Sequence, residues 1–203
     1  MKLLRLLPWL ALVIGPSACA PDARADGARY ALDDRDRTAP VDGRARCAPE
    51  ELVLHRGSAV RYAAPVKVHP AFVSRLERFE QIAREVGIEV YGRAPRTLHH
   101  GGAYACRTMP SGRYSEHAFG NALDLEGFTF PAAGKGKREV RVHVSEGWSE
   151  RGAPEAKRFL ARLLARLDDH DVFRAIVGPP DPTHRDHLHL DAGPWSYQRY
   201  API

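Results

Sequence analysis

The sequence predicts an α+β domain in which a small antiparallel sheet is flanked by helices. Two observations predict this class. Stretches with helical apolar spacing follow Pro70 and Pro154, and short segments of alternating, β-branched or aromatic residues lie between and around them. The chain has 203 residues, of which 44% are hydrophobic and 27% charged. This composition supports one packed core and excludes a fibrous, low-complexity or polytopic membrane protein.

The two helical stretches are both expected to pack into the core. Pro70 opens the first, and Gly87 is placed to stop it. The second follows Pro154 and carries leucines on one face and arginines on the other. The apolar positions are Phe72, Leu76, Phe79, Ala83 and Val86 in the first stretch and Phe159, Leu160, Leu163, Leu164 and Leu167 in the second.

Four short segments are predicted to be strands because they alternate or are rich in β-branched and aromatic residues. They cover residues 88–91, 122–130, 139–144 and 187–190. Between the second and third, residues 132–137 are small, glycine-rich and basic, which is typical of an exposed hairpin loop.

The N-terminus is predicted to be a secretory signal over residues 1–25. Lys2 and Arg5 lead a short apolar run that is too short to span a bilayer, and cleavage is expected after Ala25. A poor lipobox before Cys19 leaves a lipid anchor at that residue as the alternative. Residues 26–46 lack apolar periodicity and are expected to form a flexible leader, so that the domain covers residues 47–203. The protein is therefore expected to be secreted or periplasmic.

Export changes how the charge and the cysteines are interpreted. Removing residues 1–25 takes away three basic residues and one acidic residue, which lowers the formal net charge from +5 to +3. The remaining basic residues are not gathered into one tract, so no nucleic-acid partner is expected. Without Cys19, the pair Cys47 and Cys106 remains, and in an oxidising compartment these two are expected to form a disulfide.

The first segment with chemical character runs from Ser115 to Asp124. It places His117 and Asp124 seven residues apart, with Gly120 between them. If Gly120 turns the chain into a strand, Asp124 points away from the core while its neighbours Leu123 and Leu125 point into it.

The second segment runs from His184 to Asp191. The period of two in a strand would place His187 and His189 on one face, with leucines on the other. Hydrolytic zinc sites take three protein ligands from His, Asp or Glu and keep a position for water. His117, Asp124 and one of His187 or His189 would supply that set, and the remaining histidine could act as general base. The alternative is that each segment is an ordinary loop or a solvated strand edge.

These motifs resemble those of a known group of enzymes. The pattern Ser115-x-His117-x-x-Gly120-x-Ala122-x-Asp124 with a later His187-x-His189 resembles the LAS-type zinc metallopeptidases, which include lysostaphin-type enzymes, D-Ala-D-Ala peptidases and the hedgehog domain. The chain is still more similar to extensin-like C-terminal domain proteins, through the segments 102–107, 115–128 and 178–191. The resemblance implies a LAS/hedgehog-like fold.

The resemblance also implies a role for each site residue. The zinc ligands would be His117, Asp124 and His189, and His187 would be catalytic beside the metal. His184 matches a further active-site histidine, which leaves the identity of the base open between His184 and His187. Arg107 would bind or polarise the substrate carbonyl.

The expected function is therefore a secreted Zn²⁺-dependent peptidase or amidohydrolase that acts on peptidoglycan cross-links or stem peptides, with muropeptides as substrates. A non-catalytic, zinc-stabilised module that binds the cell wall is the alternative, because the hedgehog domain carries such a site without established peptidase action. Retention of His184 and His187 beyond the ligand set favours the enzyme.

Overall fold

The computed structural model describes residues 30–47, 51–179 and 181–200. The predicted signal, its cleavage site and Cys19 lie outside these ranges. Within them, no helix combines the length and the apolar character needed to cross a bilayer.

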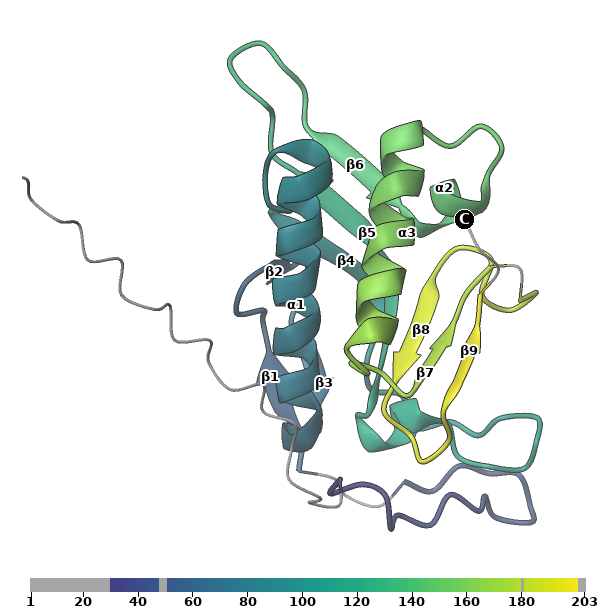
Figure 1. Ribbon diagram of the computed structural model, residues 1–203. Helices are drawn as coiled ribbons and strands as arrows, with labels where there is room; N and C mark the ends of the chain where they lie inside the picture. The colour runs from purple at the N-terminus through teal and green to yellow at the C-terminus, as the bar shows by residue number, and fades with distance from the viewer. Residues whose placement is uncertain (1–29, 48–50, 180, 201–203) are drawn as a thin grey trace, which may run out of the picture.

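The structure confirms the α+β class, with two sheets and two long helices (Figure 1). The helices are α1 (Pro70–Tyr91) and α3 (Pro154–Asp169), with the short α2 (Val144–Trp148) and the 3-10 turn η1 (Glu116–Phe119). The strands are β1 (Val53–His55), β2 (Arg61–Tyr62), β3 (Val66–Val68), β4 (Thr97–Gly102), β5 (Ala122–Phe130), β6 (Val140–His143), β7 (Ala175–Val177), β8 (Leu188–Asp191) and β9 (Tyr197–Arg199).

The main sheet has the strand order β2-β4-β5-β8-β7-β9, and β6 also pairs with β5. The prediction of an antiparallel sheet is therefore only partly correct. The pairs around β5 are antiparallel, and so is the separate β1–β3 sheet, but β2 and β9 join the main sheet in parallel. These two edge strands have two and three residues, too few to give a periodic signal in the sequence.

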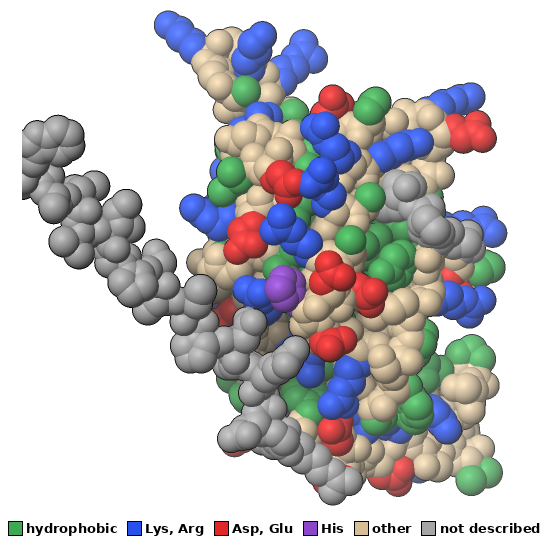
Figure 2. Space-filling view, viewed as in Figure 1, with side chains coloured by type: hydrophobic (Ala, Val, Ile, Leu, Met, Phe, Trp, Pro, Cys, Tyr) green, Lys and Arg blue, Asp and Glu red, His purple; other side chains and the backbone are tan. Residues whose placement is uncertain are grey.

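The helices α1 and α3 lie side by side over one face of the sheet (Figure 1). Their apolar faces bury every residue that the sequence predicted for the core. On their outer faces, Arg166 of α3 pairs with Glu85 and Glu89 of α1. Acidic and basic side chains are accordingly interleaved over both helices in Figure 2. Such exposed pairs contribute little stability, so the buried apolar face must hold the helices on the sheet.

The predicted strand at residues 88–91 is wrong, because α1 continues to Tyr91. The helix ends at Gly92, whose left-handed φ of 68° lets its N–H donate to the Ile88 carbonyl. Gly87 does not stop the helix. It lies against Pro95 and Phe130, and a Cβ there would approach them to 2.8 and 2.9 Å. The glycine is needed for this close packing rather than for a turn.

The strand predicted at residues 122–130 matches β5, and residues 132–137 lie in the exposed loop to β6. This loop projects from the body with its basic side chains outward (Figure 2). The other two strands differ by a residue or two at their ends. Val144 begins α2, and His187 immediately precedes β8.

Residues 30–47, which we call the N-terminal strap, pack on the domain. The predicted flexible leader is therefore wrong for this part of the chain: Leu32 is fully buried, and Thr38 forms an antiparallel bridge with Arg113. The predicted disulfide is confirmed, since Cys47 at the end of the strap is bonded to Cys106. Isolated anchor residues such as Leu32 leave no periodic pattern in the sequence. The composition of this segment therefore indicated a flexible leader although the segment packs on the domain.

Gly120 is the turn between η1 and β5, and it allows us to predict an effect on stability. Its φ is 63°, and a Cβ would lie 2.6 Å from Leu52 Cδ2 and 2.8 Å from the His69 nitrogen. Gly120→Ala is expected to lower the free energy of unfolding by about 2 kcal/mol or more, measured by urea denaturation. The control is Gly92→Ala, with a similar φ but open space around it, which should cost only about 1 kcal/mol, the cost of the left-handed conformation alone. Equal losses would show that contacts at Gly120 are unimportant.

Candidate metal centre

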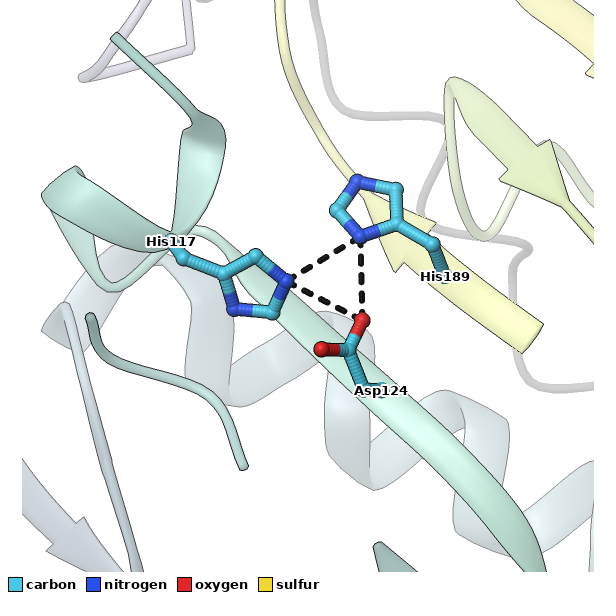
Figure 3. A group of neighbouring side chains, drawn as sticks. All are labelled: His117, Asp124 and His189. Carbon is cyan, nitrogen blue, oxygen red and sulfur yellow. Dashed lines mark hydrogen bonds and ion pairs between the residues drawn. The ribbon is translucent and has the colours of Figure 1, made fainter. Parts of the chain in front are cut away.

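Three side chains from different elements converge at one point (Figure 3). His117 comes from η1, Asp124 from β5 and His189 from β8. The pairing of β5 with β8 places Asp124 directly opposite His189. Because Leu123 and Leu125 fill the core on the other face of β5, the pleat turns Asp124 away from them.

The facing atoms of this group lie within hydrogen-bond distance of one another. Asp124 Oδ1 is 3.0 Å from His117 Nε2 and 3.1 Å from His189 Nδ1, and the two nitrogens are 3.1 Å apart. A tetrahedral zinc ion with ligand bonds of about 2.0–2.1 Å holds its ligand atoms roughly 3.3 Å apart. The donor set therefore fits a zinc ion with little movement.

In His117 and His189, the ring nitrogen that points away from Asp124 has a hydrogen-bond partner of its own. His117 Nδ1 lies 2.8 Å from the Ala103 carbonyl oxygen, which can only accept, so this nitrogen donates. His189 Nε2 lies 2.9 Å from an oxygen of Asp191, and the other Asp191 oxygen accepts from the Gly193 N–H. In neutral imidazoles these contacts leave the unprotonated nitrogens facing Asp124, as a metal ligand requires.

His189 gives the centre a pH dependence in the metal-free protein. Burial disfavours its charged form, but hydrogen bonds with Asp124 and Asp191 outweigh this and raise the pKa of His189 to about 9. Burial likewise raises the pKa of Asp124, and its hydrogen bonds to His117 and His189 reverse this and hold that pKa well below its usual range. The charged ring of His189 is therefore stabilised by the two carboxylates that it contacts.

The metal-free protein should therefore lose stability as the pH rises. A group with a raised pKa stabilises the fold fully below its unfolded pKa of about 6.5, and this contribution disappears as the pH passes about 9. We expect the free energy of unfolding to fall by on the order of 3 kcal/mol between these limits, as measured by urea denaturation in a chelator. Asp191→Asn should reduce the slope. A slope that Asp191→Asn leaves unchanged would contradict this account.

The three side chains lie on the wall of a cleft of about 480 Å³. The cleft is also lined by Arg107, His184 and His187, so the structure brings together all six residues that the sequence selected. His187 Nε2 is 3.8 Å from Asp124 Oδ1, and the His187 ring lies 5.1 Å from that of His184. Arg107 is exposed on the loop that follows the disulfide.

The two additional histidines are each held by a carboxylate. His187 Nδ1 is 2.9 Å from an oxygen of Asp186, and His184 Nδ1 is 2.8 Å from an oxygen of Asp181. Burial lowers the pKa of His184, and electrostatic interactions with His189 and His187 lower it further, although the hydrogen bond to Asp181 opposes them. A neutral ring at neutral pH can accept a proton.

Several residues around the cleft carried no clear signal in the sequence. Asp181 is separated from the histidine segment by a turn, and nothing in its local pattern links it to His184. Tyr197 lines the cleft from β9 and had no signal, whereas Tyr104, which lines it from loop 103–115, belongs to the extensin-like segment 102–107. Asp191 did have a signal, since its position two residues after His189 predicts the same face of the strand.

Comparison with known proteins adds one finding. No curated protein and no solved structure matches this chain. The family model for the extensin-like protein C-terminus matches residues 17–199, which include the strap, the disulfide and every residue of the candidate metal centre. The chain therefore belongs to the extensin-like protein C-terminal family.

Proposed function

We propose that this protein is an exported zinc-dependent peptidase or amidohydrolase that acts on the peptide cross-links or stem peptides of bacterial peptidoglycan. The observation that carries the proposal is the convergence of His117, Asp124 and His189 in an open cleft that also holds two further histidines. A purely structural zinc site is normally closed by four protein ligands. A set of three ligands, with the two further histidines His184 and His187 in the same cleft, favours a hydrolytic site.

Each residue has a role in this proposal. His117, Asp124 and His189 hold the metal, which when bound lowers the pKa of a water to about 7 and polarises carbonyl groups. His187, 3.8 Å from Asp124 Oδ1, is placed to accept a proton beside the metal. His184 is the second candidate for this role. Arg107 would orient the substrate through its carbonyl or carboxylate oxygens.

The substrate class and the fold relationship come from the resemblance to LAS-type peptidases. The cleft walls suit an extended peptide with polar groups, since they combine Tyr104, Trp195 and Tyr197 with the cationic Arg107. Export is supported by the disulfide, which persists in oxidising compartments, and by the signal-like N-terminus.

The test is to incubate zinc-loaded protein with defined muropeptides and to separate the products by chromatography and mass spectrometry. We expect the wild type to cleave a peptide bond. His187→Ala should retain its zinc and lower kcat by roughly 100-fold or more, because the loss of a general base has an effect of this size. His184→Ala is the matched variant, and whichever substitution removes the acidic limb of the pH–rate profile, where the rate rises as the base loses its proton, identifies the base.

The same experiment can refute the proposed enzymatic function. If the wild type and His187→Ala both leave every muropeptide intact while zinc remains bound, the proposed hydrolase is refuted. Co-sedimentation with insoluble peptidoglycan would then test the cell-wall-binding module. If neither protein binds zinc at all, both functions fail.

A further inference from the structure

The strap is attached to both segments that carry the metal ligands. Asp33 pairs with Arg174, whose N–H donates to the Asp191 carbonyl at the end of β8. Tyr30 donates from its hydroxyl to Asn121 Oδ1 at 2.6 Å, between η1 and β5. In Figure 1 the strap, in purple and blue, runs along the lower edge beside the teal loop 103–115. The strap therefore contacts the chain next to the candidate ligands, at Asn121 directly and at Asp191 through Arg174.

The deepest of these attachments is the ion pair between Arg37 and Glu116. Only 6% of Arg37 and 7% of Glu116 is exposed. The pair is bidentate, with Arg37 Nε 2.5 Å from one Glu116 oxygen and an Arg37 terminal nitrogen 3.1 Å from the other. Arg37 also donates to the carbonyls of Leu32 and Arg35, so the backbone of the strap fixes the orientation of the guanidinium.

Glu116 is fully engaged at this position. Besides Arg37, it accepts from Asn121 Nδ2 at 2.7 Å. Its side chain packs against Gly193, where a Cβ would lie 2.9 Å from the carboxyl carbon. A glutamate in such a crowded pocket has one orientation available, and a buried carboxylate without its cation is strongly destabilised.

Glu116 is followed directly by the ligand His117, and both lie in η1, a single 3-10 turn of four residues. Turns of this length have poor internal hydrogen-bond geometry and need outside contacts to fix their direction. Apart from its contacts with Asp124 and His189, His117 is held by the Ala103 carbonyl on its ring and by the Ala105 N–H, which donates to its carbonyl. A long contact of 3.4 Å joins its own N–H to the Ser115 hydroxyl. The bidentate, charge-assisted pair at the preceding residue adds a strong restraint on the direction of this turn.

We infer that Arg37 is a positioning residue for the metal centre, acting through Glu116 to orient the imidazole of His117. This inference rests on the proposed function insofar as it assigns a metal to the site. Arg37 is not itself a lining residue of the cleft, and its contacts lead to η1 through Glu116 and the Phe119 ring, 5.2 Å from the guanidinium. It also lies 5.8 Å from the Trp195 ring, so the route through Glu116 needs a direct test. A segment with the composition of a linker would then set the geometry of the site.

The test compares Arg37→Met with Arg44→Met, which removes the same charge from an exposed position in the same strap. Zinc affinity is measured by competition with a chromophoric chelator, and the d–d spectrum of bound Co²⁺ reports ligand geometry. Both are recorded where circular dichroism shows each variant fully folded. We expect Arg37→Met to weaken zinc binding roughly 10- to 100-fold and to change the Co²⁺ spectrum. Arg44→Met should do neither.

A double-mutant cycle tests the route through Glu116. If Arg37 acts through Glu116, then Arg37→Met combined with Glu116→Gln should bind zinc no more weakly than the weaker of the two single variants. Arg37→Lys should rescue only part of the affinity, because lysine keeps the charge but not the bidentate geometry. Additive losses in the cycle, or wild-type affinity and spectrum in Arg37→Met, would overturn the inference.

The metal-free protein separates this inference from the proposed function. If the wild type binds no zinc, the proposed function fails, and the His117 imidazole signals in a ¹H–¹⁵N spectrum decide the role of Arg37. Displacement of those signals in Arg37→Met but not in Arg44→Met supports positioning. Unchanged signals in both variants refute it.

Discussion

Replacing Asp124 with asparagine is expected to abolish stable zinc binding and, with it, hydrolysis. The substitution keeps the shape of the side chain but removes the only negative charge among the three facing ligand atoms. The apparent binding free energy of about 10–16 kcal/mol for four-ligand zinc sites implies about 3 kcal/mol for each ligand, which corresponds to a loss of affinity of roughly 100-fold or more. Zinc content after dialysis and muropeptide cleavage are the two measurements.

The control for this variant is Asp169→Asn, which removes the same charge from the exposed end of α3. It should bind zinc and cleave substrate as the wild type does. Asp124→Asn protein that retained one equivalent of zinc after dialysis would show that Asp124 is not a ligand. A second expected result concerns thermal stability. Added zinc should raise the Tm of the Asp169→Asn control and leave the Tm of Asp124→Asn unchanged.

Removing the disulfide with Cys47→Ser and Cys106→Ser together is expected to cost about 4 kcal/mol of unfolding free energy. The bond closes a loop with a sequence separation of 59 residues, and the chain-entropy model gives a value of this order for such a loop. The bond also ties the end of the strap to the residue before Arg107. We therefore expect KM for a muropeptide to rise more than kcat falls, because Arg107 is assigned to binding.

Urea denaturation of the double variant and steady-state kinetics check these expectations, and wild-type protein treated with a reductant should behave in the same way. The double variant avoids a single unpaired thiol and its side reactions. Wild-type protein in which reduction leaves the urea midpoint unchanged would contradict the stability prediction. If kcat falls and KM does not change, Arg107 is not primarily a binding residue.

The sequence predicted the candidate centre well because the residues of each segment obey short-range rules. The period of two in a strand predicted that Asp124 points away from the buried leucines, and this is what β5 does. For β8, the same rule failed to decide between His187 and His189 as the third candidate ligand. That choice depends on strand register, since the pairing of β5 with β8 places His189 opposite Asp124 and leaves His187 just before the strand.

The errors arose where long-range packing decides the structure. Ile88, Val90 and Tyr91 have strand-forming character, but α1 continues through them because the partly buried Val90 and Tyr91 pack against the core. The strap was missed for the same reason. Its anchors, Leu32 and Arg37, are single residues whose partners lie far along the chain, and no local pattern records a contact between Arg37 and Glu116.

The position of β5 has a consequence for the motions of the site. This strand is paired on both edges, with β4 along one side and with β8 and then β6 along the other. Its amides should therefore exchange with solvent only through global unfolding. Asp124 lies in this most protected part of the protein and His189 on the neighbouring strand, whereas Arg107, His184 and His187 lie on connecting segments. Under the proposed function, local opening of those segments would accommodate a substrate while Asp124 and His189 stay in place.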